Sequence, residues 1–248
     1  MVIDSQVFVG TSLFGHTQVA EILLQRMDRL DIDRAVICPI KPRHYDLAES
    51  NDAVADLVQR YPERFIGFAR VDPWQEDQAL GELQRARAEL GLRGLLLHPL
   101  EEAFPITSHL VDSLLVYARD YNLPVMIEGG HPRVSEASQI AELARRFPQV
   151  TMIVTHAGQL NISGRGLFDA ARLFTAHPNA ILETSAVYRQ DFLESMAAAI
   201  GCGRLVFGSG SPLFDQEIEL ARVQHLSLSP PDLTRVLGDN MAALLEPL

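Results

Sequence analysis

Short apolar runs alternate with amphipathic stretches from one end of the 248-residue chain to the other. Eight such runs span residues 2–9, 34–38, 65–70, 94–98, 124–128, 151–155, 180–184 and 204–208. Each is short and apolar enough to form a parallel strand buried on both faces. Apolar residues recur at helical spacing in residues 17–30, 52–61, 75–90, 108–121 and 135–147. The pattern therefore predicts eight strands connected by crossover helices.

Eight such units without a long linker, a charge block or a low-complexity tract favour a closed (β/α)₈ barrel over an open doubly wound sheet. One barrel of this kind commonly fills about 250 residues, so we expect residues 1–248 to form a single domain. No GxGxxG motif follows the first run, which removes the main sequence support for a dinucleotide-binding sheet. Residues 158–166 contain three glycines and are predicted to form an extended loop after the sixth strand.

The charge balance restricts the partners of the chain. The sequence has 21 Lys and Arg against 32 Asp and Glu, a formal net charge of -11. This charge gives no basic field for nucleic acid or anionic lipid, so we expect a small-molecule ligand, with a homo-oligomer left open. The only cysteines, Cys38 and Cys202, do not form a disulfide or CxxC pattern. No apolar run approaches the length of a membrane span, and no basic leader is evident, so we expect a cytoplasmic protein.

Several phrases, in order along the chain, resemble the amidohydrolase-related family of metal-dependent hydrolases and decarboxylases. They are IDSQVF (3–8), YPERFIGF (61–68), VDP (71–73), LHP (97–99), LPV (123–125), THAG (155–158), FGSGSP (207–212) and GDN (238–240). Together they cover nearly the whole chain. The resemblance implies a TIM barrel and the hydrolysis or decarboxylation of a small polar molecule.

The resemblance also implies a set of metal-ligand positions, most of which have changed. The family typically uses two His on the first strand, a His on the fifth, often a His on the sixth, and an Asp on the eighth. At these positions the chain has Gln6, Phe8, Glu128, His156 and Gly210. Phe and Gly side chains offer no lone pair to a metal. We therefore expect the usual metal site to be absent and no cofactor to be needed.

Alternation along the strands predicts that His98, Glu128 and His156 project into the barrel mouth from three successive strands. On this basis His98 shares a face with Leu96, Glu128 with Met126, and His156 with Val154, while Asp4, Gln6 and Phe8 share one face of the first strand. We expect Glu128 to abstract a proton or activate water. His156 would return the proton or hold a developing oxyanion.

Three alternatives stay open for the same side chains. His98, Glu128 and His156 also match the inventory of a relocated catalytic zinc site. They could instead form a hydrogen-bonded polar plug, with the chain retained as a catalytically retired binding or interaction subunit. His98 individually suits a structural turn because Pro99 follows it.

Further side chains are candidates for substrate binding because they follow or end predicted strands. They are Gln6, Phe8, His131, Glu183, Ser209 and Ser211. Neither Ser209 nor Ser211 has an evident His–Asp pair to activate it as a nucleophile, so their expected contribution is a hydroxyl group offered to a ligand.

Overall fold

The computed structural model describes residues 1–160 and 164–246, and its strands coincide with the eight predicted runs. The parallel strands are β1 (Ile3–Thr11), β3 (Arg34–Pro39), β4 (Phe65–Gly67), β5 (Ala69–Arg70), β6 (Leu95–Leu97), β7 (Val125–Ile127), β8 (Met152–Val154), β9 (Ala180–Glu183) and β10 (Leu205–Val206). The third run contains both β4 and β5, separated at Phe68. The expected α/β barrel with parallel strands is confirmed.

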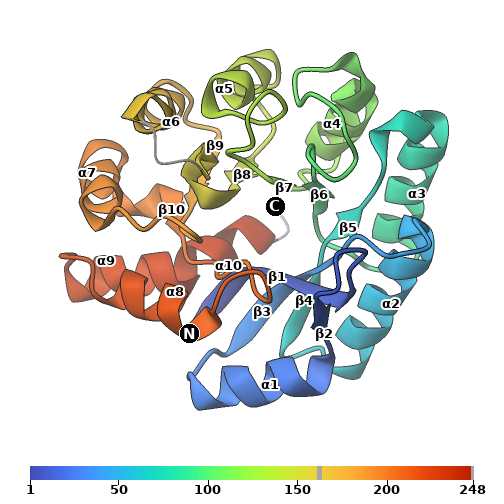
Figure 1. Ribbon diagram of the computed structural model, residues 1–248, viewed down its shortest axis with the longest axis horizontal. Coiled ribbons are helices and arrows are strands. Elements are labelled where there is room, and N and C mark those ends of the chain that lie inside the picture. The colour runs from blue at the N-terminus through green and yellow to red at the C-terminus, as the bar shows by residue number, and fades with distance from the viewer. Residues whose placement is uncertain (161–163, 247–248) are drawn as a thin grey trace.

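Helices surround the strands in the order predicted for crossover connections (Figure 1). They are α1 (Ala20–Arg29), α2 (Leu47–Arg60), α3 (Asp77–Ala88), α4 (Asp112–Asp120), α5 (Ala137–Arg146), α6 (Gly164–Ala176), α7 (Gln190–Ile200) and α8 (Gln216–Gln224). The chain ends in α9 (Pro230–Thr234), a π-helical turn (Arg235–Asp239) and α10 (Asn240–Leu245). Side-chain capping fixes where two of the helices begin. The Asp46 carboxylate accepts the Glu49 N–H before α2, and Glu136 with Gln139 forms a capping box before α5.

The barrel closes through backbone hydrogen bonds between the first and last strands. Ser5 N–H donates to the Phe207 carbonyl at 2.9 Å, and Phe8 N–H donates to the Ser211 carbonyl at 2.7 Å. At the Phe68 break, Phe68 N–H still bonds to the Ile37 carbonyl at 3.0 Å. Closure therefore brings the end of β1 beside the loop that follows β10.

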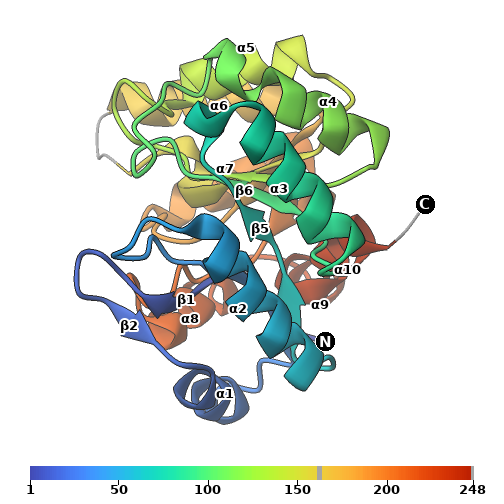
Figure 2. The same cartoon turned by 90° about the vertical axis from the view of Figure 1, so that its right-hand side faces the viewer.

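Two apolar cores lie on the two faces of the barrel wall. The interior core takes residues from most of the parallel strands, including Val36 of β3, Leu96 of β6, Met126 of β7 and Ile153 of β8. Met241 and Leu245 of α10 belong to this interior core and cover the amino-terminal ends of the strands. Figure 2 shows α10 and the chain termini on one side of the molecule and the tip of β1 with β2 (Thr17–Gln18) on the other. The open mouth is therefore at the carboxyl ends of the strands.

Two expectations for local structure were wrong. Residues 17–30 do not form one helix, because Thr17 and Gln18 pair antiparallel with Thr11 and Gly10 as strand β2, and α1 begins at Ala20. The loop predicted over residues 158–166 is shorter, since Gly164 already starts α6. Residues 161–163 of that loop lie outside the described residues. Across residues 1–160 and 164–246, no helix is long and apolar enough to cross a membrane.

A β-bulge corrects the predicted facing of the first strand. The β1–β3 register shifts between Asp4 and Val7, which adds one residue to β1. Asp4 aligns with Ala35 of the outer core and accepts a hydrogen bond from Gln216 of α8 at 2.7 Å. Phe8 packs in the interior core. Gln6 and Phe8 therefore face inward as expected, but Asp4 does not.

Candidate active site

Glu128 and His156 form an ion pair at the carboxyl ends of β7 and β8. Their Oε1 and Nε2 atoms are 2.6 Å apart, and the residues are only 3% and 1% exposed. The other Glu128 oxygen, Oε2, accepts hydrogen bonds from Gln6 Nε2 at 2.6 Å and Thr155 Oγ1 at 3.2 Å. Both carboxylate oxygens are thus satisfied, as a buried charge requires. Of the three expected catalytic residues, these two are brought into direct contact.

His156 reaches Glu128 through an unusual turn rather than through strand alternation. Val154 packs in the outer core, so the prediction that Val154 and His156 share an inward face was wrong. The inward residue is Thr155. His156 and Ala157 have φ values of 56° and 49°, in the left-handed region that costs non-glycine residues energy. This turn swings the His156 ring into the barrel, and Glu183 Oε2 accepts the His156 N–H at 3.0 Å.

The second ring nitrogen of His156 faces Ser185. Nδ1 lies 2.8 Å from Ser185 Oγ and 3.2 Å from the Ser185 carbonyl oxygen, while Ser185 Oγ donates to Glu183 Oε2 at 2.7 Å. Both ring nitrogens therefore face acceptors, which favours the imidazolium. Ser185, His156 and Glu128 have the composition of a nucleophile triad. However, the hydroxyl proton of Ser185 is committed to Glu183 and the residue is fully buried, so it is not an activated nucleophile.

Electrostatics keep the pair ionised. Burial acts to lower the pKa of His156, but the Glu128 charge and hydrogen bond outweigh it and raise that pKa to about 9. Burial acts to raise the pKa of Glu128, but His156 holds it below its ordinary range. Burial raises the pKa of Glu183 to about 7. The pair therefore holds a proton on His156 and a negative charge on Glu128 at neutral pH.

His98 lies at the mouth of the barrel beside a different set of groups. Its Nδ1 accepts the Glu101 N–H at 3.3 Å, which leaves the proton on Nε2 in the neutral ring. Burial lowers the pKa of His98, and Arg70 lowers it further. His131 stacks on His98 with ring centroids 6.1 Å apart, and burial lowers its pKa to about 4. His98 is thus a neutral mouth residue next to Glu128, and its hydrogen bond and ion pair go to Glu101 rather than to the Glu128–His156 pair.

A buried cluster of four charges lies behind His98, and the sequence analysis did not find it. Arg70 Nη2 is 2.5 Å from Glu101 Oε2 and 2.8 Å from Glu102 Oε1, and Lys41 Nζ is 2.8 Å from the same Glu102 oxygen. Lys41, Arg70 and Glu102 have side chains at most 6% exposed, against 14% for Glu101. The sequence signal was an arginine at the end of a buried apolar strand, where an unpaired charge is too costly.

The remaining expected substrate-binding residues occupy different settings. Glu183 is fully buried and supports His156 and Ser185 from behind. Ser209 Oγ accepts the Ser211 N–H at 3.1 Å. Ser211 Oγ donates to Gln18 Oε1 at 2.9 Å and accepts from Arg26 Nη1 at 3.0 Å, which ties the loop after β10 to α1. The hydroxyl groups of Ser209 and Ser211 are therefore engaged in the wall of the barrel.

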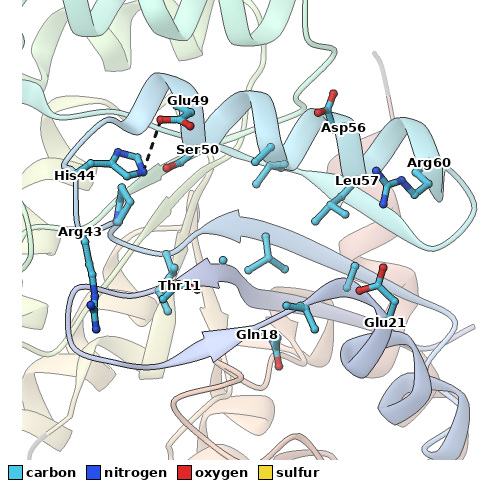
Figure 3. A pocket seen from close by; sticks show the side chains of 18 residues that line it. Thr11, Gln18, Glu21, Arg43, His44, Glu49, Ser50, Asp56, Leu57 and Arg60 are labelled. Carbon is cyan, nitrogen blue, oxygen red and sulfur yellow. Dashed lines mark ion pairs between the residues drawn. The ribbon is translucent and has the colours of Figure 1, made fainter.

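Two cavities lie near the carboxyl ends of β1 and β3. The mouth cavity has a volume of about 110 Å³ and is lined by Phe8, Ser12, Phe14, His16, Ile40, His98, Glu101 and Leu213. A larger groove of about 630 Å³ lies outside the mouth, between the β1–β2 hairpin and α2 (Figure 3). Figure 3 shows His44 and Glu49 near one end of this groove and Glu21 and Arg60 near the other. Glu128 and His156 line neither cavity, whereas His98, the neighbour of Glu128 on the adjacent strand, lines the mouth cavity and not the groove.

The family model that matches this chain is that of the amidohydrolases, over residues 19–246. The chain therefore belongs to the amidohydrolase family, which is a family of enzymes. This confirms the resemblance drawn from the sequence motifs.

Particular relatives are decarboxylases. The gamma-resorcylate decarboxylase of Rhodococcus jostii (strain RHA1) is 28% identical over an alignment of 115 residues that covers 40% of this chain and 35% of that protein. The match thus spans about a third of the length of the curated relative. The crystal structure of 5-carboxyvanillate decarboxylase from Sphingomonas paucimobilis has a TM-score of 0.80 at 16% identity, covering 100% of this chain and 99% of that one. These likenesses to solved structures establish the fold.

Several solved structures with this fold contain bound manganese. A dihydroxybenzoic acid decarboxylase from Polaromonas sp. JS666, with bound manganese and the inhibitor 2-nitroresorcinol, has a TM-score of 0.79 at 17% identity, covering 98% and 96% of the two chains. The fold therefore accommodates a metal in other proteins, so the expectation of no cofactor has to be tested against the donor atoms of this chain.

The donor atoms here do not fit that metal. Gln6 turns its amide N–H₂ to Glu128, and His156 Nε2 faces the same carboxylate, so neither offers a lone pair to a common point. Within the described ranges, no group of three or more His, Cys, Asp or Glu residues is placed to hold a metal ion. This arrangement also does not support a relocated zinc site made by His98, Glu128 and His156.

Proposed function

We propose that this chain is an amidohydrolase-family enzyme that decarboxylates a small aromatic acid, or hydrolyses a molecule of similar size, using the Glu128–His156 pair for proton transfer. The observation that carries the proposal is the buried contact of 2.6 Å between the two side chains at the active end of the barrel. Functional groups of such barrels lie at this end, and a desolvated acid–base pair can move a proton without help from solvent. The decarboxylase relatives favour decarboxylation within this class.

The chemistry needs one proton and no redox partner. In a decarboxylation, the bond between the ring carbon and the carboxylate breaks, its electron pair stays on the ring carbon, and CO₂ leaves. That carbon then takes the proton that His156 Nε2 directs at Glu128 in the free protein, so the contact between the two side chains has to open when the substrate is bound. Glu128 stabilises the imidazolium before transfer, and Gln6 and Thr155 keep the carboxylate in place. Water later returns a proton to the pair.

We also propose that the reaction proceeds without the family metal. Support comes from the donor set: Gln6 and Glu128 occupy two of the ligand positions implied by the resemblance and bind each other. Elemental analysis of purified protein should find well below one equivalent of transition metal, since a catalytic site needs about three protein ligands. Near-stoichiometric metal that survives dialysis would overturn this part of the proposal.

A second candidate is a retired enzyme kept as a binding subunit. It is favoured by the small mouth cavity of about 110 Å³, which is below the roughly 300–1,000 Å³ of ordinary ligand sites. The low exposure of the pair points the same way. In this case the Glu128–His156 contact would serve as a polar plug.

Turnover separates the two candidates. Wild type would be screened against hydroxybenzoates, related aromatic acids, lactones and amides, followed by CO₂ release or product detection. Glu128→Gln and His156→Asn should each reduce kcat by about 10²-fold or more while circular dichroism stays native, because acid–base catalysis contributes about 10²–10⁴-fold. Glu217→Gln, at an exposed ion pair on α8, is the matched control and should retain activity. Unchanged kcat in both site variants would assign the pair to structure.

A further inference from the structure

One oxygen atom of Glu101 lies between two potential donors at the mouth. Glu101 Oε2 is 2.5 Å from Arg70 Nη2 and 3.5 Å from His98 Nε2. Because His98 Nδ1 accepts a backbone N–H, Nε2 carries a proton. A guanidinium and an imidazole N–H that converge on one carboxylate oxygen form the kind of site that binds the carboxylate of a ligand.

We propose that Arg70 and His98 bind the carboxylate of a small organic acid, and that Glu101 fills this position when no acid is bound. The inference rests on the proposed function in taking the mouth as the substrate site, and it names the residues that recognise the substrate class. Glu101 and His98 both line the mouth cavity, and Arg70 lies directly behind Glu101. An acid entering the cavity therefore meets Glu101 first.

The charge balance of the cluster favours an exchange of carboxylates. Lys41 and Arg70 face Glu101 and Glu102, so two positive charges balance two negative ones. Removing Glu101 from Arg70 would leave an excess positive charge in a buried setting, which is costly unless another anion replaces it. A ligand carboxylate restores the balance, whereas a neutral ligand does not. The cluster therefore selects for an anion.

The exposure of Glu101 and the spare hydrogen-bonding capacity of Arg70 identify Glu101 as the residue that is displaced. Its side chain is 14% exposed, whereas those of Arg70 and Glu102 are fully buried. Leu100, beside it in the loop after β6, is 50% exposed. Arg70 Nε is buried and has no hydrogen-bond partner among residues 1–160 and 164–246. Arg70 can thus offer a further N–H to an incoming carboxylate in a bidentate arrangement.

The position of this site suits the proposed reaction. Glu128 N–H bonds to the Leu97 carbonyl at 2.9 Å, so His98 and Glu128 follow directly from paired positions on β6 and β7. An acid whose carboxylate is held by Arg70 and His98 would have its apolar part against Phe8, Phe14 and Ile40 in the cavity. This geometry indicates a compact aromatic or aliphatic monocarboxylate.

The test is a binding titration with benzoate at constant ionic strength, for wild type and Glu101→Ala. Removing the internal carboxylate should tighten benzoate binding by at least about tenfold, equivalent to about 1.4 kcal/mol. Benzyl alcohol has a similar ring and no charge, and its affinity should change much less. Glu217→Ala removes an exposed glutamate on α8 and should leave benzoate affinity at the wild-type value.

Two results would overturn the proposal: an unchanged benzoate affinity in Glu101→Ala, or an equal gain for benzyl alcohol, which would show only an enlarged cavity. Adding His98→Phe to Glu101→Ala should remove much of the gain, and full retention would exclude His98 as a donor. Circular dichroism checks the fold of each variant. Because no turnover is measured, a failure here is distinguishable from a failure of the Glu128–His156 proposal, which is tested by kcat.

Discussion

Gln6 Nε2 donates a hydrogen bond to Glu128 Oε2 across the barrel at 2.6 Å. By resemblance, both residues occupy positions where members of the family carry histidine ligands to one metal. In this chain the two positions hold a donor and an acceptor that bind each other, and His156 binds the other carboxylate oxygen. The Gln6–Glu128 hydrogen bond thus connects β1 to the end of β7, which a bound metal ion would connect in the pattern implied by the resemblance. The Glu128 carboxylate keeps a charged group at the carboxyl ends of the strands.

The Glu128–His156 pair should be strongly coupled in stability. Glu128→Gln or His156→Asn leaves the other group buried without its countercharge, so each is expected to cost about 3–5 kcal/mol. The double variant should lose at least about 1 kcal/mol less than the sum, because neither charge remains unpaired. Urea unfolding of the four proteins at pH 7 measures the coupling. Strictly additive losses would show that the pair is not a unit.

Gly208 is required by the packing beneath this pair. A Cβ atom at Gly208 would lie 2.1 Å from Glu183 Oε1 and 2.8 Å from Ser5 Oγ. Gly208→Ala should therefore destabilise the fold by about 1–3 kcal/mol through overpacking. Gly203→Ala is the matched control, since a Cβ there meets nothing within 4 Å. Thermal unfolding should show a clear loss in Tm for the first variant and little change for the second; equal Tm values would contradict the close approach.

Asp4 should make stability depend on pH. Burial raises its pKa from 3.8 to about 6, so its protonated form is favoured in the folded state. The stability it contributes is fully present below about pH 3.8 and is lost as pH rises through 6. Asp4→Asn removes the ionisation, and Gln216 Oε1, which is buried without a partner among the described residues, can accept from the new amide after an amide flip.

The expected gain from Asp4→Asn is therefore largest above pH 6. Each unit of difference between the folded and unfolded pKa corresponds to about 1.4 kcal/mol. From acidic to alkaline pH, the free energy of unfolding of the variant should therefore rise by up to about 3 kcal/mol relative to that of wild type. Urea titrations at pH 4, 6 and 8 give the comparison. A difference between the two proteins that stays constant over this range would show that Asp4 does not titrate as described.

The strands could be predicted because each is buried on both faces and therefore appears as an unbroken apolar run. The same alternation correctly placed His98 and Glu128 inside, because β6 and β7 are regular. Alternation gave the wrong facing for Asp4. It also gave the wrong reason for the inward position of His156, because Val154 faces outward and a turn brings the His156 ring inside. A bulge in β1 and a left-handed turn after β8 break the two-residue period, and a single sequence carries no local signal for either.

The charged cluster escaped prediction for a different reason. Lys41 lies in a turn-rich segment after the second predicted strand, where a charge is usually solvated, yet its ammonium is buried against Glu102. Its partner Glu102 lies in the turn after β6, about 60 residues away in sequence, and the two meet only because the strands are arranged side by side in the barrel. Sequence reasoning could identify Arg70 as a charge that needs a partner, but the partner depends on the three-dimensional arrangement.

Restoring the family ligands tests how much of the old metal geometry survives. Gln6→His, Phe8→His, Glu128→His and Gly210→Asp return the implied ligands around His156, and Gly210 lies near Gln6, since a Cβ there would be 3.6 Å from Gln6 Oε1. The same Cβ would be only 2.8 Å from the Phe214 ring. We therefore expect the quadruple variant to bind zinc poorly and the addition of Phe214→Ala to improve binding.

Calorimetric titration with zinc compares wild type, the quadruple variant and the five-residue variant. Affinity should remain about 10–100-fold below that of a supported site, because groups that orient the ligands have changed. The control is the five-residue variant with Glu128 left as wild type, whose carboxylate would still hold His156 Nε2. This control should bind zinc less well, because the hydrogen bond to Glu128 keeps His156 Nε2 from offering its lone pair to the metal. If the folded five-residue variant binds zinc no better than wild type, the positions assigned by resemblance do not converge on one point in this barrel.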